Sequence, residues 1–243
     1  MAAGTTRMLG IGLAAFALAQ AAAALPLPKD EAERACWLSH TRQRTRPNTE
    51  GLTSVDFSNL RDGYVVRSPF VVAFAVRGMG VAPAGTALPD TGHHHILIDT
   101  RLPQSLTAGL PFSDTHRHFG KGQTMTTLDL PPGDHTLRLL FADAQHRPYF
   151  VFSPEIRVKV AGRRGAEPLR WDLTRTEGCR AWHQDEQARP RPPGEWVGIG
   201  NWRDGEPVVS PFALHFVADG WGVCAAGATV ERTGHFILEI RRD

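Results

Sequence analysis

Histidine is the residue type of this chain with the clearest capacity for chemistry. The sequence holds 11 histidines, and the stretch between residues 93 and 146 carries seven of them. These seven are His93, His94, His95, His116, His118, His135 and His146. Neutral imidazole is a ligand that both zinc and copper accept in proteins. The stretch is therefore a candidate metal site.

Two groups of these histidines have the spacing of strand residues that share a face. Side chains two positions apart on a β-strand point the same way. His93 and His95 therefore share one face of a strand, and His116 and His118 share one face of another. Two such pairs on neighbouring strands can place four imidazoles around one ion. The predicted metal ligands are His93, His95, His116 and His118, with His135 or His146 assisting.

An internal repeat organises the chain. Residues 59–98 align without a gap on residues 201–240, at an offset of 142, with 18 identities in 40 positions. The shared runs include Arg61-Asp62-Gly63, Ser68-Pro69-Phe70 and Thr91-Gly92-His93. The second copy is partial, because it has no counterpart to residues 101–160 of the first copy. We expect this partial copy to dock on the first copy or on another chain, since a few strands alone leave a sheet edge exposed.

The second copy indicates which way the histidines of residues 93–95 face. Phe236 and Leu238 alternate there with other residues, and their side is the apolar one, which should meet the core. At the offset of 142, His94 is then expected to point inward, while His93 and His95 point outward. His94 is expected to be a buried structural histidine, or a hydrogen-bond donor to a ligand.

The elements that must position these residues are predicted to be strands. Residues 71–76 form a short apolar run between Ser-Pro and Gly, which is typical of a buried strand. Turn residues recur about every ten to fifteen positions, as in a sandwich. The sequence predicts an all-β fold, an antiparallel, immunoglobulin-like β-sandwich with a partial second repeat. Polar, proline-free stretches at 30–43 and 179–188 predict a short helix before each copy.

The first residues have the pattern of an export signal. Arg7 precedes an apolar run that ends in Ala22-Ala23-Ala24, and this order predicts a signal peptide cleaved after Ala24. The protein is then expected to be periplasmic or secreted, without a stable membrane span. The expected divisions are 1–24 signal peptide, 25–50 helical lead-in, 51–162 histidine-bearing sandwich, 163–194 linker with a short helix, and 195–243 partial copy. A net charge of +2 without a basic stripe argues against a nucleic-acid partner.

The histidine motifs also carry a resemblance to a known family. The stretches concerned are 78–86 (GMGVAPAGT), 91–99 (TGHHHILID), 116–124 (HRHFGKGQT) and 130–137 (LPPGDHTL). Over about residues 55–160 the chain resembles the bacterial domain-of-unknown-function family 4399. The resemblance implies an exported β-domain of unassigned activity. The family tends to carry several histidines after the strand that ends near Phe141, whereas this chain keeps His146 and has Tyr149 where another histidine is usual.

The cysteines suggest a second constellation. Cys36 with His40, and Cys179 with His183, repeat a C-x3-H spacing that puts each pair on one face of a helix. Two such helices in contact would form either a Cys36–Cys179 disulfide or a Cys2His2 metal site. An oxidising compartment favours the disulfide, and Cys224 would then remain a thiol.

These observations favour a metal-binding protein, with copper preferred to zinc, that binds, stores or delivers its ion. Met79 and Met125 could add a thioether for copper(I), although such side chains more often serve packing. One alternative is an envelope interaction or ligand-binding module whose histidines are structural. Another is a metal-dependent enzyme with Asp99 or Asp114 as acid or base. The expected partners are the metal ion and an envelope protein, or a second copy of the chain joined through the partial repeat.

Overall fold

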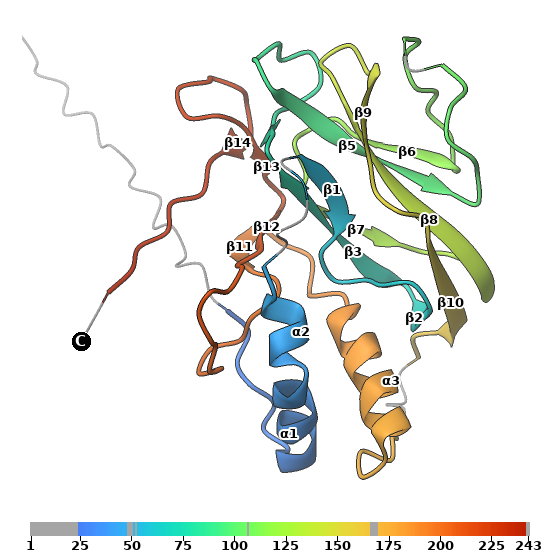
Figure 1. Cartoon of the computed structure of the whole chain (residues 1–243), viewed down its shortest axis with the longest axis vertical. Coiled ribbons are helices and arrows are strands. Elements are labelled where there is room, and N and C mark those ends of the chain that lie inside the picture. Colours follow the sequence, from blue (N-terminus) through green and yellow to red (C-terminus); the bar gives the residue numbers. More distant parts are fainter. Residues whose placement is uncertain (1–23, 48–50, 52, 106, 166–169, 242–243) are drawn as a thin grey trace, which may run out of the picture.

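Two facing β-sheets form the main body of the protein. The computed structural model describes residues 24–47, 51, 53–105, 107–165 and 170–241. One sheet has the order β1-β3-β7, from β1 (Ser54–Phe57), β3 (Phe70–Arg77) and β7 (Met125–Leu128). The other has the order β2-β10-β8-β5-β4, from β2 (Tyr64–Ser68), β10 (Ile156–Arg163), β8 (Gly133–Ala142), β5 (Thr91–Ile98) and β4 (Gly80–Val81). Strand β6 (His116–Phe119) pairs with β5, and β9 (Pro148–Phe152) pairs with β8. Most of the pairings are antiparallel, so the predicted all-β sandwich is confirmed (Figure 1).

The core lies between the two sheets and follows the alternation of the strands. Phe70, Val72 and Phe74 of β3 are buried against alternate residues of β5 and β8, among them Ile96 and Leu139. Each such side chain contributes about 1.5–3 kcal/mol by leaving water. This burial fixes the register of β5, and a shift by one residue would turn its histidines to the other face.

The partial copy repeats the first copy in three dimensions. Strands β11 (Trp196–Ile199) and β12 (Phe216–Asp219) pair as β1 and β3 do, and β13 (Gly222–Val223) pairs with β14 (Thr233–Gly234) as β4 does with β5. The bonds Ser68–Pro69 and Ser210–Pro211 are both cis. The sequence repeat is therefore also a structural repeat.

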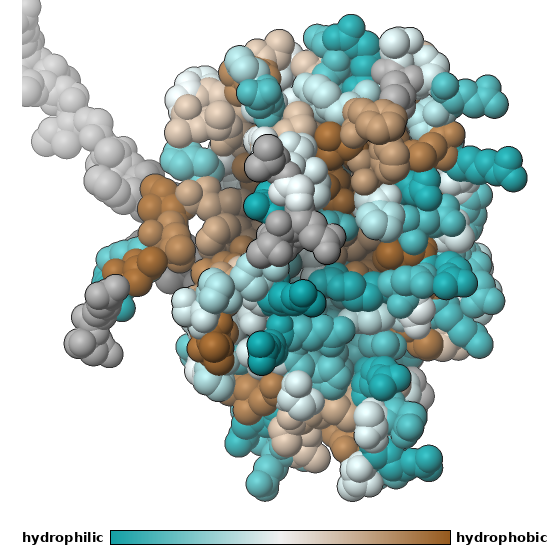
Figure 2. Space-filling view, in the orientation of Figure 1, coloured by the Kyte–Doolittle hydropathy of each residue, from teal (hydrophilic) through white to brown (hydrophobic). Residues whose placement is uncertain are grey.

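The strand expected at the end of the partial copy does not form. Residues 235–241 do not form a β-strand, and Ile237 and Ile240 are 86% and 78% exposed. Phe236 keeps the inward contact, stacking on Phe216. In the first copy, β5 is held between β6 and β8, whereas no strand of the described residues pairs with 235–241. This segment leaves the body as an apolar arm (Figures 1 and 2).

Helices precede each copy, as predicted, but each one contacts the other copy. They are α1 (Glu31–Ser39) and α2 (Thr41–Thr45) ahead of the first copy, and α3 (Thr176–Gln187) ahead of the second. The carbonyl of Ala188, just after α3, accepts from Val71 N–H of the first copy at 2.8 Å. The carbonyl of Thr45, at the end of α2, accepts from Ala213 N–H of the second copy at 2.9 Å. The two copies therefore exchange their helices.

The predicted signal peptide lies, apart from Ala24, outside the described residues. Within the described ranges, no helix has the length and apolar character needed to cross a membrane.

Candidate metal centre

Strands β5 and β6 bring three of the predicted ligands together. These strands are antiparallel neighbours, and their register sets His95 opposite His118. His93 lies two residues before His95 on the same face of β5. Since one ring nitrogen from each of the three histidines lies within 4.8 Å of the others, the group could hold one metal ion.

The distances within this cluster suit a small coordination sphere. His93 Nε2 and His95 Nε2 are 3.0 Å apart. Nitrogens about 2.0–2.1 Å from a tetrahedral zinc ion are separated by roughly 3.3 Å, so this pair needs little movement. The His118 ring centroid lies 4.9 Å from that of His93 and 5.0 Å from that of His95.

His146 closes the cluster from a tight turn between β8 and β9. Its ring centroid is 4.8 Å from that of His118 and 5.1 Å from that of His93. The backbone of His146 has φ +64°, in the left-handed region, and its N–H donates to the carbonyl of Asp143 at 2.9 Å. The Asp143 carboxylate accepts from two N–H groups of the same turn. A short, internally bonded turn thus presents a fourth imidazole.

The two β5 histidines of the cluster are shielded from solvent even though they face away from the main core, whereas His118 and His146 are half-buried. His93 and His95 are 0% and 1% exposed. The Phe112 ring stacks on His118 at 4.6 Å and lies edge-on to His146 at 5.1 Å. Next to the cluster, Leu110 joins a small second core with residues of β5 and β8. The loop between β5 and β6 therefore covers the side of the sheet that sequence reasoning expected to face outward.

His94 lies on the opposite face, as the alternation of the second copy predicts. Its ring is 5.0 Å from the rings of both Phe74 and Phe141, inside the main core. Burial is the main cause that lowers the pKa of His94 to about 3. This histidine is part of the core and not of the cluster.

Burial favours the neutral form of His93, His95 and His118. Burial first, and the neighbouring histidines second, lower the pKa of His93 to about 4 and that of His95 to about 2. Burial also lowers the pKa of His118. Near neutral pH these imidazoles carry free lone pairs, which is the form that binds a metal ion.

Three buried ring nitrogens of the cluster have no hydrogen-bond partner. They are His93 Nδ1, His95 Nδ1 and His118 Nε2. A buried polar atom without a partner costs about 1–3 kcal/mol. An ion held between the Nε2 atoms of His93 and His95 would not reach their Nδ1 atoms, so among these three nitrogens it could satisfy His118 Nε2.

His116 and His135, also predicted as ligands, lie apart from the cluster that His93, His95 and His118 form. His116 lies opposite Leu97 in the β5–β6 register, two pairs beyond His95 and His118. His135 lies at the opposite end of the sheet, where its ring bonds to Asp99 Oδ2 at 2.7 Å. The H-x-H spacing put His116 on the correct face but could not tell how far along the strand the pairing would reach.

The two candidate methionines lie elsewhere. Met79 packs against the main core, and Met125 lines a cavity between the two copies. The cluster therefore offers imidazole nitrogen and no thioether sulfur from these two residues.

The second predicted constellation takes the form of a disulfide. Cys36 Sγ and Cys179 Sγ are bonded, joining α1 to α3. The rings of His40 and His183 stack beside them at 4.1 Å, and His183 Nε2 accepts from the Arg44 guanidinium at 2.9 Å. Because a metal-binding cysteine must be a free thiolate, these four residues do not form a Cys2His2 site.

Sequence reasoning missed two residues that shape the cluster. Phe112 comes from a loop without periodicity, and no pattern marked it. A Cβ atom added to Gly120 would lie 2.1 Å from His118 Cε1, so the absence of a side chain at residue 120 leaves room for the His118 ring. Its position two residues after His118, inside the family motif, was the available signal.

Part of the chain is similar to known proteins. Residues 72–161 match the family model described as "Domain of unknown function (DUF4399)", which confirms the resemblance over this part of the chain. No curated protein matches the chain. A solved structure of fibronectin(III)-like modules of Clostridium thermocellum CbhA is similar at 10% identity and a TM-score of 0.24, over 45% of this chain and 99% of that one. The matched residues 72–161 of this chain include strands β5 and β6 and the turn that holds His146.

Proposed function

We propose that this protein binds one transition-metal ion, copper(II) or zinc, through His93, His95 and His118, with His146 as the fourth ligand. The observation that carries the proposal is the convergence of three imidazoles, those of the buried His93 and His95 and the half-buried His118, each of which offers a ring nitrogen within 4.8 Å of the others. The Nε2 atom of His118 is buried and lacks any partner among the described residues. An ion bound there would satisfy this nitrogen, for which the fold provides no hydrogen bond.

The donor set limits the choice of ion. Imidazole nitrogen suits zinc and copper, whereas soft thioether sulfur would have favoured copper(I). Because Met79 and Met125 lie outside the cluster, copper(II) and zinc are the ions that the site fits. The role is binding, storage or delivery at the cell envelope, where the export signal of the sequence would send the protein.

Metal uptake by the purified protein tests the proposal. The wild type is expected to take up one equivalent of copper(II) or zinc, measured by elemental analysis after dialysis. His118→Ala should abolish uptake, because it removes one of three converging ligands. His116→Ala is the matched control, since it lies two residues away on β6 and outside the cluster, and it should bind as the wild type does.

Thermal unfolding distinguishes the metal site from a purely structural cluster. Metal should raise the Tm of the wild type and of His116→Ala, and a chelator should reverse the rise. If neither metal nor chelator moves the Tm and no ion is retained, the histidines are structural and the proposal is wrong.

A further inference from the structure

A second group of metal-ligating side chains lies where α1 meets α3, and it shares no residue with the histidine cluster. It consists of Cys36 in α1, His40 at the C-terminal cap of that helix, and Cys179 in α3. Figure 1 shows the two helices side by side. The two sulfurs and one ring nitrogen of His40 lie within 4.8 Å of one another. Two cysteines and one histidine are a ligand set that zinc accepts.

The His40 ring is held in the way that histidine ligands usually are. Its Nδ1 donates to the carbonyl of Cys36 at 3.0 Å, since a carbonyl oxygen can only accept. In the neutral ring the lone pair then lies on Nε2. Metal-binding histidines commonly donate their other N–H to a backbone carbonyl, which fixes the ring. The ring also stacks on His183 at 4.1 Å, which limits its rotation further.

His183 has the same spacing from Cys179 as His40 has from Cys36, but it is engaged elsewhere. Its Nε2 accepts from the Arg44 guanidinium at 2.9 Å. The protein therefore offers three ligands at this place, and water would fill the fourth position of a tetrahedral ion.

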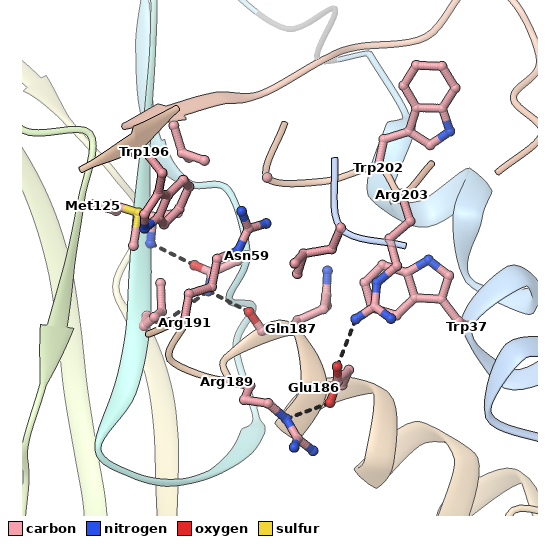
Figure 3. Close-up of a pocket in the computed structure, with 15 residues that line it drawn as sticks. Trp37, Asn59, Met125, Glu186, Gln187, Arg189, Arg191, Trp196, Trp202 and Arg203 are labelled. Atoms are coloured by element: carbon pink, nitrogen blue, oxygen red, sulfur yellow. Dashed lines mark hydrogen bonds and ion pairs between the residues drawn. The ribbon is translucent and has the colours of Figure 1, made fainter. Parts of the chain in front are cut away.

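The charged groups nearest to the first cysteine are already paired. Arg44 and Arg203 each lie 3.8 Å from the centroid of the ring of Trp37, the next residue in the sequence. Arg44 pairs with Glu206, and Arg203 pairs with Glu186 at 2.8 Å (Figure 3). These pairs leave the charge of a divalent ion to be balanced by two thiolates.

The disulfide and a bound ion exclude each other. Zinc binds thiolates, and in the disulfide each sulfur is bonded to the other. Sulfurs about 2.3 Å from a tetrahedral zinc ion are roughly 3.8 Å apart, whereas bonded sulfurs are about 2.0 Å apart. The Cα atoms of Cys36 and Cys179 are 5.6 Å apart. At this spacing, rotation about the two Cα–Cβ bonds can separate the sulfurs while the helices stay in place.

We propose that Cys36, His40 and Cys179 form a zinc site when their disulfide is reduced, and that oxidation releases the ion. The reductant is a dithiol, which gives two electrons and two protons to the disulfide and itself becomes a disulfide. Each of the two new thiols then loses its proton to water as its sulfur bonds to zinc. The contact between the exchanged helices thus holds either a covalent bond or an ion.

Cobalt(II) binding by the His118→Ala chain tests the proposal, because this variant lacks one ligand of the histidine cluster. Cobalt is the probe, since thiolate ligands give it an intense charge-transfer band in the near ultraviolet. A phosphine is the reductant, because a dithiol would itself bind the metal. The reduced protein is expected to take up one equivalent of cobalt with this band, and the oxidised protein should show no band. Zinc should displace the cobalt and remove the band.

Four further changes in this chain locate the site. Cys36→Ser should abolish the band, whereas Cys224→Ser should keep it, because Cys224 is not one of the converging residues. His40→Gln should weaken cobalt binding at least about tenfold, since one of three ligands is lost. His183→Gln is the matched control, and it should bind cobalt as the parent chain does.

Thiol alkylation gives a second readout that needs no further variant. Zinc should protect Cys36 and Cys179 of the reduced protein, and a chelator should expose them. Cobalt uptake without the thiolate band, unprotected cysteines in the presence of zinc, or a band that persists in Cys36→Ser would overturn the proposal. Loss of the native circular dichroism on reduction with zinc present would do so as well, since the site needs both helices. The histidine cluster is unaffected by these outcomes, because it contributes no residue to this group.

Discussion

At the scale of single residues, Gly120 decides whether the His118 ring can point into the cluster. The ring covers the space that a side chain at residue 120 would need, with His118 Cε1 and Nε2 at 2.1 and 2.2 Å from an added Cβ. The atoms that must yield are the end of a side chain, which can rotate away without breaking the sheet. The glycine therefore serves the position of a ligand more than the stability of the fold.

Gly120→Ala should consequently keep the fold and lose the metal. We expect a Tm close to that of the wild type and a metal affinity at least about tenfold lower, since one of three ligands is displaced. Isothermal titration with zinc measures this. Gly234→Ala is the control, because an added Cβ there has nothing within 4 Å. Undiminished zinc affinity in Gly120→Ala would count against His118 as a ligand.

At the scale of elements, the disulfide and the exchanged helices connect the two copies. The bond joins Cys36 of α1 to Cys179 of α3 over a sequence separation of 143 residues. Trp37 and Trp182 pack around it with Cys36 in a separate small core. A crosslink over so long a loop removes much freedom from the unfolded chain.

Reduction of this bond should lower the stability of the protein without unfolding it at room temperature. The expected loss is about 2–4 kcal/mol in the free energy of unfolding, measured by urea denaturation with and without reductant. The double variant Cys36→Ser with Cys179→Ser should match the reduced wild type. In the oxidised protein, thiol labelling should modify Cys224 alone, and only after unfolding, because Cys224 is buried. Labelling of Cys36 in the oxidised native protein would contradict the assignment.

The elements also show how far the sequence could be interpreted. Alternation along β5 predicted correctly that His94 faces the core, because the hydrophobic pattern fixes strand register. The same alternation predicted a strand at 235–241, which does not form since it has no neighbouring strand to pair with among the described residues. Local patterns do not encode tertiary contacts. They could therefore not predict which residue lies opposite His116, which is Leu97, or that Phe112 from an irregular loop would cover the cluster.

At the scale of the whole molecule, buried neutral histidines should make the protein sensitive to acid. Burial lowers the pKa of His183 to about 2 and that of His215 to about 4. Above a pH of about 6.5 both histidines are neutral in the folded and unfolded chains, and stability is at its full value. As the pH falls from there toward 4, the unfolded chain takes up protons that the folded chain cannot, so stability is lost.

His183→Gln should flatten this acid response. At pH 4.5 one such histidine accounts for a loss of roughly 2–3 kcal/mol, which glutamine avoids while still offering an acceptor to Arg44. Urea denaturation at pH 7.5 and 4.5 measures the difference. His235→Gln, on an exposed side chain, should leave the slope as it is in the wild type. Equal slopes for His183→Gln and wild type would exclude His183 as a source of the response.

The exchange of helices has a consequence for how the chain matures. During synthesis the strands of the first copy emerge before α3, so Val71 N–H must wait for the carbonyl of Ala188, and Asn59 for that of Gln187. Thr45, made early, has its partner in Ala213, made late. Neither copy can complete its hydrogen bonds as an independent unit on the ribosome. The synthesis of α3 and the residues just after it therefore sets the earliest point at which the first copy can complete its hydrogen bonds.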